Sequence, residues 1–167
     1  GSVFYFRTDK DAPRSKVVKV DVLAKEPVWT DVVPESAETL NGVGFINDQL
    51  VLNYLQDAHT VIKIYEPSGK FVREVQLPGI GSAGGFGGKR ADSETFYSYS
   101  SYNAPPTIYR YDMKAGKSKL FRTANVKFDG SQYVVEQVFY NSKDGTRVPM
   151  FLTYKKGLKK NGANPTI

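Results

Sequence analysis

An internal repeat is the feature that most constrains this fold. Ile64-Tyr65-Glu66 and Arg110-Tyr111-Asp112 are matching segments, and each leads into a turn closed by a glycine, Gly69 in one case and Gly116 in the other. The two tyrosines lie 46 positions apart. A period in the forties that is filled by short strands is typical of the four-stranded blades of a β-propeller.

The repeat predicts three successive units of strands and turns. The first unit matches the repeat at Lys19-Val20-Asp21 but lacks an innermost strand. We expect strands at 3–8, 16–22 and 28–33 in the first unit, at 42–46, 50–56, 61–66 and 71–77 in the second, and at 84–88, 95–101, 107–112 and 119–122 in the third.

Composition supports an all-β fold. The chain has 11 Tyr and 10 Phe against one Trp, and 15 Gly and 9 Pro punctuate its short apolar runs. No long segment has apolar residues at helical spacing, and no apolar run approaches the roughly 18 residues of a membrane helix. The sequence therefore predicts no membrane partner.

Charge and cysteine content exclude several classes of site. The net charge is +6, but the basic residues are scattered one per strand or turn, apart from Lys155, Lys156, Lys159 and Lys160. Scattered charge indicates a solvated surface, so we predict no nucleic-acid partner. The absence of Cys excludes disulfides and thiolate metal sites and leaves the compartment open.

A second kind of element comes after the repeats. Gln137 to Tyr140 and Arg147 to Tyr154 alternate apolar and polar residues, and Ser142-Lys143-Asp144-Gly145 between them has the composition of a tight turn. The pattern predicts a β-hairpin in which Gly145 takes a positive φ.

In sequence and position this hairpin resembles the one that opens the peptidase domain of prolyl oligopeptidases, in which a β-propeller caps an α/β-hydrolase domain. Lys155-Lys156-Gly157 and the loop from Asn161 to Pro165 are similar to the turn and loop after the hairpin in that family, and DQLVLNYLQDAHTVIKIYEPSG and KLFRTANVKFD are similar to its last blades. The resemblance implies a partial propeller of about three of seven blades over residues 1–126. It also implies a hinge and the start of the α/β-hydrolase domain over 127–167.

The resemblance implies a function for the longer protein. That protein is expected to be a serine peptidase that cleaves short peptides after proline, with the propeller excluding folded proteins. The implied partners are short proline-containing peptides and the remainder of the peptidase chain, and self-association is expected for these residues alone. The alternative is a non-enzymatic propeller that presents loops to a protein partner.

The run Gly79-Ile80-Gly81-Ser82-Ala83-Gly84 spells the dinucleotide motif GxGxxG. That motif requires a helix after the glycines, and residues from Thr95 onward are predicted as strand, so we expect no nucleotide cofactor. The glycines are instead interpreted as sites where an innermost strand packs closely on its neighbours, and this applies to Gly81, Gly84 and Gly85.

No residue is predicted to be catalytic. His59 is the only histidine and lies where a turn enters a strand, and Ser82 lacks the glycine that would complete a nucleophile elbow. In the family that this chain resembles, the catalytic residues lie beyond Ile167, so none carries over to this sequence.

Two further groups receive structural interpretations. Asp9 with Asp11 and Glu35 with Glu38 are interpreted as solvated loop charge, so no metal is expected. Phe96, Tyr97, Tyr99 and Tyr102 are interpreted as packing between blades, with Tyr97 and Tyr99 on one strand face and Phe96 on the other.

Overall fold

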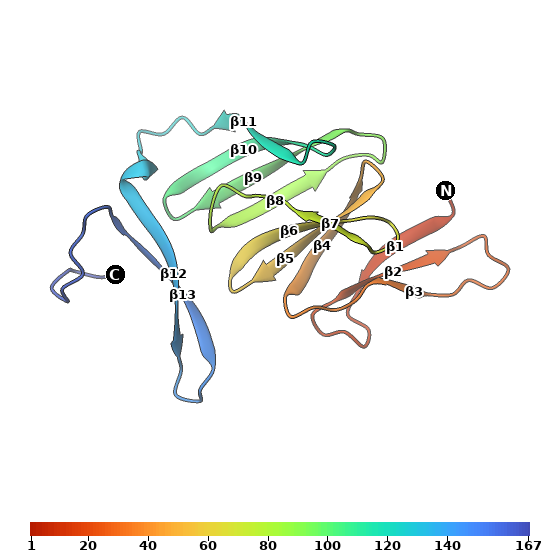
Figure 1. Cartoon of the computed structure of the whole chain (residues 1–167), viewed down its shortest axis with the longest axis horizontal. Helices are drawn as coiled ribbons and strands as arrows, with labels where there is room; N and C mark the ends of the chain where they lie inside the picture. Colours follow the sequence, from red (N-terminus) through yellow and green to blue (C-terminus); the bar gives the residue numbers. More distant parts are fainter.

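A computed structural model describes residues 1–167 and consists almost entirely of strands (Figure 1). Its only helix is the 3₁₀ turn η1 (Gly130–Gln132). The strands are β1 (Val3–Thr8), β2 (Lys16–Asp21), β3 (Thr30–Val33), β4 (Thr39–Ile46), β5 (Gln49–Gln56), β6 (His59–Tyr65), β7 (Phe71–Glu74), β8 (Ser82–Gly87), β9 (Glu94–Ser101), β10 (Ala104–Asp112), β11 (Lys117–Thr123), β12 (Tyr133–Asn141) and β13 (Arg147–Lys155). The structure holds no helix that is both long enough and apolar enough to cross a membrane.

The strands form three blades and a separate hairpin, which confirms the partial propeller. The sheets have the orders β1-β2-β3, β4-β5-β6-β7 and β8-β9-β10-β11, and β12 pairs with β13. All neighbours are antiparallel. The first sheet has three strands, as predicted for a unit without its innermost strand. The three sheets are arranged side by side in Figure 1, with β4 and β8 as edge strands.

Several predicted strand boundaries are wrong. Strand β7 ends at Glu74 instead of residue 77, and β10 begins at Ala104 instead of Thr107. Strand β4 begins at Thr39 instead of Gly42, because its pairing with β5 continues past a register shift between Leu40 and Gly42. Strand β12 begins at Tyr133 instead of Gln137, where it pairs with Lys155. In β4 a bulge at Asn41-Gly42 looked like a turn in the sequence.

The core lies between the blades. Strand β5 shows how, because Leu50, Leu52 and Tyr54 pack toward the first blade while Val51 packs toward the third. The cluster shared by the second and third blades contains Ile46, Val51, Ile62, Ile64, Val75, Ala83, Phe86, Tyr97, Tyr99, Tyr111 and Met113. Alternate residues of a strand point to opposite faces, so the second blade, which lies between the other two, is apolar on both sides.

The aromatic series of β9 packs largely as predicted. Tyr97 stacks on Phe86 with ring centroids 4.6 Å apart, and Tyr97 and Tyr99 are buried, whereas Phe96 faces the other way and is 40% exposed. Tyr102 differs from the prediction, because its side chain is 68% exposed and lies outside this core.

The glycines of the β8 region support close packing at two of the three positions. A Cβ on Gly81 would lie 2.3 Å from the Ser100 carbonyl oxygen, and Gly85 has φ +116 with the Phe96 carbonyl oxygen 2.9 Å from a built Cβ. The interpretation is wrong for Gly84, where a Cβ would meet no atom within 4 Å. Gly84 lies on the exposed side of an edge strand, where the sequence pattern alone suggested an interior position.

Candidate functional site

The candidate site is the place where the hairpin β12–β13 crosses one side of the propeller (Figure 1). It meets the β5–β6 turn at Asp57 and the β9–β10 turn at Tyr102 and Asn103. These turns occupy equivalent places in the second and third blades, since each joins the second strand of its sheet to the third. The hairpin therefore lies across successive copies of the same turn.

One face of the hairpin makes these contacts. Gln137 Nε2 donates a hydrogen bond to the Asp57 carbonyl oxygen, and the Phe151 ring lies 5.6 Å from the Tyr102 ring between centroids. Gln137 and Phe151 are directly paired across the two strands, so their side chains share a face. Asn103 Nδ2 adds a hydrogen bond of 3.2 Å to the Tyr133 carbonyl oxygen at the start of β12.

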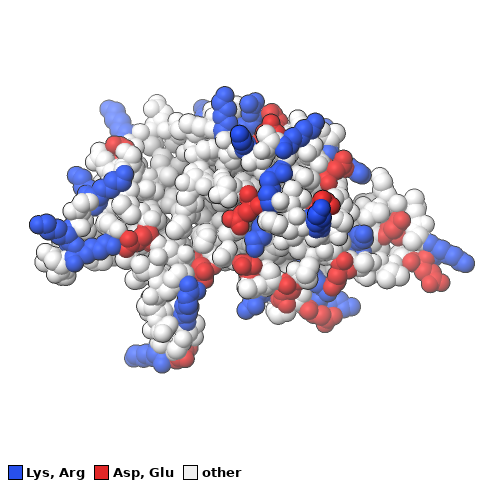
Figure 2. All heavy atoms as spheres, in the orientation of Figure 1, with Lys and Arg blue, Asp and Glu red and all other residues white.

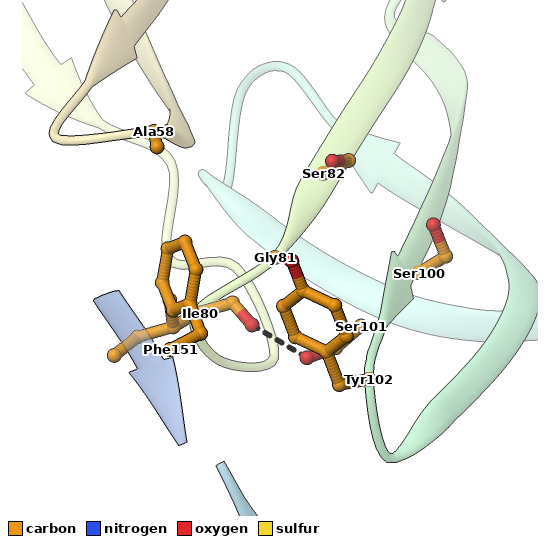
Figure 3. Close-up of a pocket in the computed structure, with 8 residues that line it drawn as sticks. All are labelled: Ala58, Ile80, Gly81, Ser82, Ser100, Ser101, Tyr102 and Phe151. Atoms are coloured by element: carbon orange, nitrogen blue, oxygen red, sulfur yellow. Dashed lines mark hydrogen bonds between the residues drawn. The ribbon is translucent and has the colours of Figure 1, made fainter. Parts of the chain in front are cut away.

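A hollow of about 300 Å³ lies between the hairpin and the blades. Phe151 comes from the hairpin, and the seven other lining residues come from the blades: Ala58, Ile80, Gly81, Ser82, Ser100, Ser101 and Tyr102 (Figure 3). The Ile80 carbonyl oxygen accepts hydrogen bonds from Ser101 Oγ at 2.7 Å and from the Tyr99 hydroxyl at 3.2 Å. No lining residue carries a charge, and Tyr102 is the one lining side chain of a type that acts in acid–base catalysis.

The candidate nucleophile and base lie in different hollows. Ser82 lines the hollow beside Phe151, whereas His59 lines a hollow of about 210 Å³ that contains Glu74 and no serine. His59 is the first residue of β6 and is half-buried, and its Nδ1 is buried without a hydrogen-bond partner. It is therefore less exposed than expected, since the sequence predicted a turn or surface residue. The geometry offers no Ser–His pair.

The carboxylates of the loops make local contacts. Glu35 accepts a hydrogen bond of 2.5 Å from the Arg14 backbone N–H, and Glu38 lies 3.6 Å from Lys63 Nζ. A hydrogen bond from Ser36 and the nearby Lys63 charge lower the pKa of Glu38. Nowhere do three His, Cys, Asp or Glu side chains gather as metal ligands would.

Burial also sets the protonation of the core tyrosines. It raises the pKa of Tyr54, Tyr97 and Tyr99, because the charged phenolate is disfavoured away from water. These hydroxyls therefore remain protonated donors. Tyr97, for example, donates to Ser118 Oγ at 2.9 Å.

The charged surface is mixed. Figure 2 shows Lys and Arg side chains interspersed with Asp and Glu over the face in view. Even in the lysine-rich C-terminal segment, Lys160 pairs with Glu136, and this contact lowers the pKa of Glu136 and raises that of Lys160. This face does not present the continuous basic stripe of a nucleic-acid interface.

Two residues of the site, Asp57 and Arg147, carry no signal in the sequence that marks them as a pair. Arg147 Nη1 lies 3.4 Å from Asp57 Oδ1, although the two residues are 90 positions apart. Nothing in the pattern around either residue predicts the pair. The only available signal was that Asp57-Ala58 occupies a two-residue turn, where Asp is common for local reasons.

Comparison with known proteins identifies the family. The family model of the prolyl oligopeptidase N-terminal β-propeller domain matches residues 1–124. The chain belongs to the prolyl oligopeptidase family. The prolyl endopeptidase of Elizabethkingia miricola is 44% identical over 171 residues, covering 100% of this chain and 24% of the relative. The dual function macrocyclase-peptidase POPB of Galerina marginata is 31% identical over 173 residues, with the same two coverages.

Solved structures of prolyl oligopeptidases agree with this membership. One comes from an analysis of two prolyl endopeptidases and their inter-domain dynamics; it has a TM-score of 0.83 at 40% identity and covers 95% of this chain and 24% of that one. Apo prolyl oligopeptidase B from Galerina marginata has a TM-score of 0.85 at 30% identity, with 95% and 23% covered. The chain thus spans about a quarter of the length of its relatives.

Proposed function

We propose that this chain supplies part of the propeller, and the first hairpin of the peptidase domain, of a serine oligopeptidase that cleaves short peptides after proline. Residues 1–126 are assigned to the propeller and residues 127–167 to the hinge and the start of the peptidase domain. The propeller's role in this proposal is exclusion, since a cap over an active site admits short peptides and rejects folded proteins. The hairpin docked across the blade turns is the observation that carries the proposal.

The face of the hairpin that points away from the propeller is consistent with the rest of a peptidase domain packing against it. Glu136, Val138, Tyr140, Met150 and Leu152 alternate with the propeller-facing residues. Tyr140 and Met150 are 50% and 41% exposed, and no residue of either strand is buried. An isolated two-stranded hairpin is marginally stable, so an apolar face of this kind is suited to packing under the rest of a domain.

A non-enzymatic interaction propeller is the second reading, and nothing in the comparisons favours it. Such a module has no need of the hairpin, whereas a two-domain peptidase does. In either reading this chain contributes no catalytic residue of its own, which stays a prediction.

A chimera tests the proposal. The corresponding quarter of the Elizabethkingia miricola enzyme is replaced by these 167 residues, and hydrolysis is measured with a short proline-containing chromogenic peptide and with a folded protein. We expect the chimera to cleave the peptide and spare the folded protein. A folded chimera that cleaves neither substrate, or that digests the folded protein, would contradict the proposal.

The chain alone provides the complementary measurement. It is expected neither to hydrolyse the same peptide nor to react with a serine-directed phosphonate, because His59 has no serine partner. Stoichiometric labelling of any serine would contradict this expectation.

A further inference from the structure

The β5–β6 turn has an unfavourable backbone conformation at Ala58. Asp57 has φ 44 and Ala58 has φ 64, so both residues of this two-residue turn are left-handed. Such turns favour Asn-Gly or Asp-Gly, because a Cβ is disfavoured at positive φ. Strain of this kind persists where the surroundings hold it in place, and it is often found at functional contacts.

This turn carries the polar contacts that reach the hairpin beyond its base. Its Asp57 carbonyl oxygen accepts from Gln137 Nε2, and its carboxylate lies 3.4 Å from Arg147 Nη1. Arg147 is held from its other side as well, with Cζ 3.3 Å from the Phe139 ring centroid. Gln137, Phe139 and Arg147 all belong to the propeller-facing side of the hairpin.

The remaining contacts do not fix the direction of the hairpin. Asn103 bonds to Tyr133 at the start of β12, and a single point at the base leaves the hairpin free to pivot. The planes of the Tyr102 and Phe151 rings are tilted by 41° to each other, and this apolar contact has little directional preference. Since the hairpin contains no buried residue, the Asp57 contacts provide the second fixed point.

We propose that Asp57 is a positioning residue that latches the hairpin to the propeller and sets the angle between them. The latch is an exposed ion pair, with 58% of the Arg147 side chain and 37% of the Asp57 side chain accessible. It is therefore sensitive to ionic strength, because salt screens exposed charges. The proposal concerns orientation and is independent of the proposed peptidase function.

Distance measurements between spin labels test the latch in the full chain. The sequence contains no cysteine, so Lys143→Cys at the hairpin tip and Lys114→Cys in the β10–β11 turn give two unique sites. With the labelled chain diluted in unlabelled chain, so that self-association adds no distance between molecules, we expect one narrow distance distribution. Asp57→Asn, which keeps a residue tolerant of positive φ, and Arg147→Gln should each lower the docked-to-undocked ratio about two- to fivefold. The double variant should be little worse than either single variant.

Asp48→Asn is the matched control. Asp48 also lies in a two-residue turn of positive φ, after Asn47, and pairs with Arg90, but it does not touch the hairpin. It should leave the distribution narrow, whereas about 1 M salt should broaden the distribution of the unmodified chain. A narrow distribution for Asp57→Asn at low salt, or equal broadening by Asp48→Asn, would overturn the proposal. If Asp57→Asn disturbs the fold of its blade, the result for Arg147→Gln tests the proposal instead, because Arg147 makes no ion pair or hydrogen bond to a blade other than that to Asp57. A broadened distance distribution for Arg147→Gln then supports the latch, and a narrow one refutes it.

Discussion

Adjacent glycines of β8 differ in what their positions allow. Gly85 combines φ +116 with a carbonyl oxygen 2.9 Å from the place of a Cβ, whereas Gly84 faces open space. Gly85→Ala should therefore lower the free energy of unfolding by about 1–3 kcal/mol, because the side chain forces both strain and a shift of β9. Urea unfolding measures this loss as a lower midpoint concentration with an unchanged slope m of the free energy against urea concentration.

Gly84→Ala is the control for that substitution. It adds a methyl group where no atom lies within 4 Å, so its free energy of unfolding should stay within about 0.5 kcal/mol of the original. Equal losses at the two positions would contradict the assignment of close packing to Gly85 and open space to Gly84.

Asp144 makes the hairpin turn sensitive to acid. Hydrogen bonds from Ser142 and from the Thr146 backbone lower its pKa from 3.8 to about 2. Since the pKa of Asp144 is lower in the folded than in the unfolded chain, its ionised carboxylate stabilises the folded turn above pH 4. This stabilisation is lost as the pH falls through about 2. An NMR titration of the Asp144 carboxyl and the Gly145 amide should show this. A carboxyl that titrates near 3.8 would contradict the prediction.

At the scale of elements, the second blade protects the free edge of β8. Asn53 Nδ2 donates to the Ala83 carbonyl oxygen at 3.2 Å, and the Ala83 N–H donates to Thr60 Oγ1 at 3.1 Å. An unpaired strand edge is a site for unwanted pairing, so side chains of one blade satisfy the backbone of the next. These contacts hold the second and third blades in register alongside their apolar cluster.

Thr60→Val tests this edge contact. Val keeps the shape but leaves the N–H of the buried Ala83 without a partner, so the free energy of unfolding should fall by about 1–3 kcal/mol. Thr30→Val, at an exposed strand position, should change it little. Thermal unfolding of both variants makes the comparison, and an unchanged midpoint for Thr60→Val would refute a stabilising edge contact.

At the scale of the whole molecule, the outer faces of the first and third blades carry exposed aromatic residues. Phe6 and Trp29 are 44% and 60% exposed on the first, and Phe96 and Phe121 are 40% and 62% exposed on the third. In both cases the opposite face of the same blade packs on a neighbour. These surfaces are of the kind that sheets bury against other sheets.

The chain by itself is therefore expected to self-associate. Light scattering at low micromolar concentration should report oligomers, and Phe6→Lys combined with Phe121→Lys should shift the population toward monomer by charging both faces. A compact monomer of 18.6 kDa with strong amide protection in all three blades would contradict the prediction.

The sequence by itself determined the blades, because a strand's pattern and turns are local. Tyr65 and Tyr111, the turns at Gly69 and Gly116, and the positive φ of Gly145 were all predictable from neighbours in the chain. The resemblance of the hairpin and the last blades identified the family before any contact between elements was known.

Only the tertiary structure decided how those elements meet. It separated Gly85 from Gly84, moved Tyr102 out of the core against Phe151, and joined Asp57 to Arg147. Each depends on which distant segment lies opposite a residue, and the two-residue period of a strand fixes the face of a side chain but not its partner. The chain's own periodicity therefore specifies the blades, while the position of the hairpin depends on contacts between residues far apart in sequence.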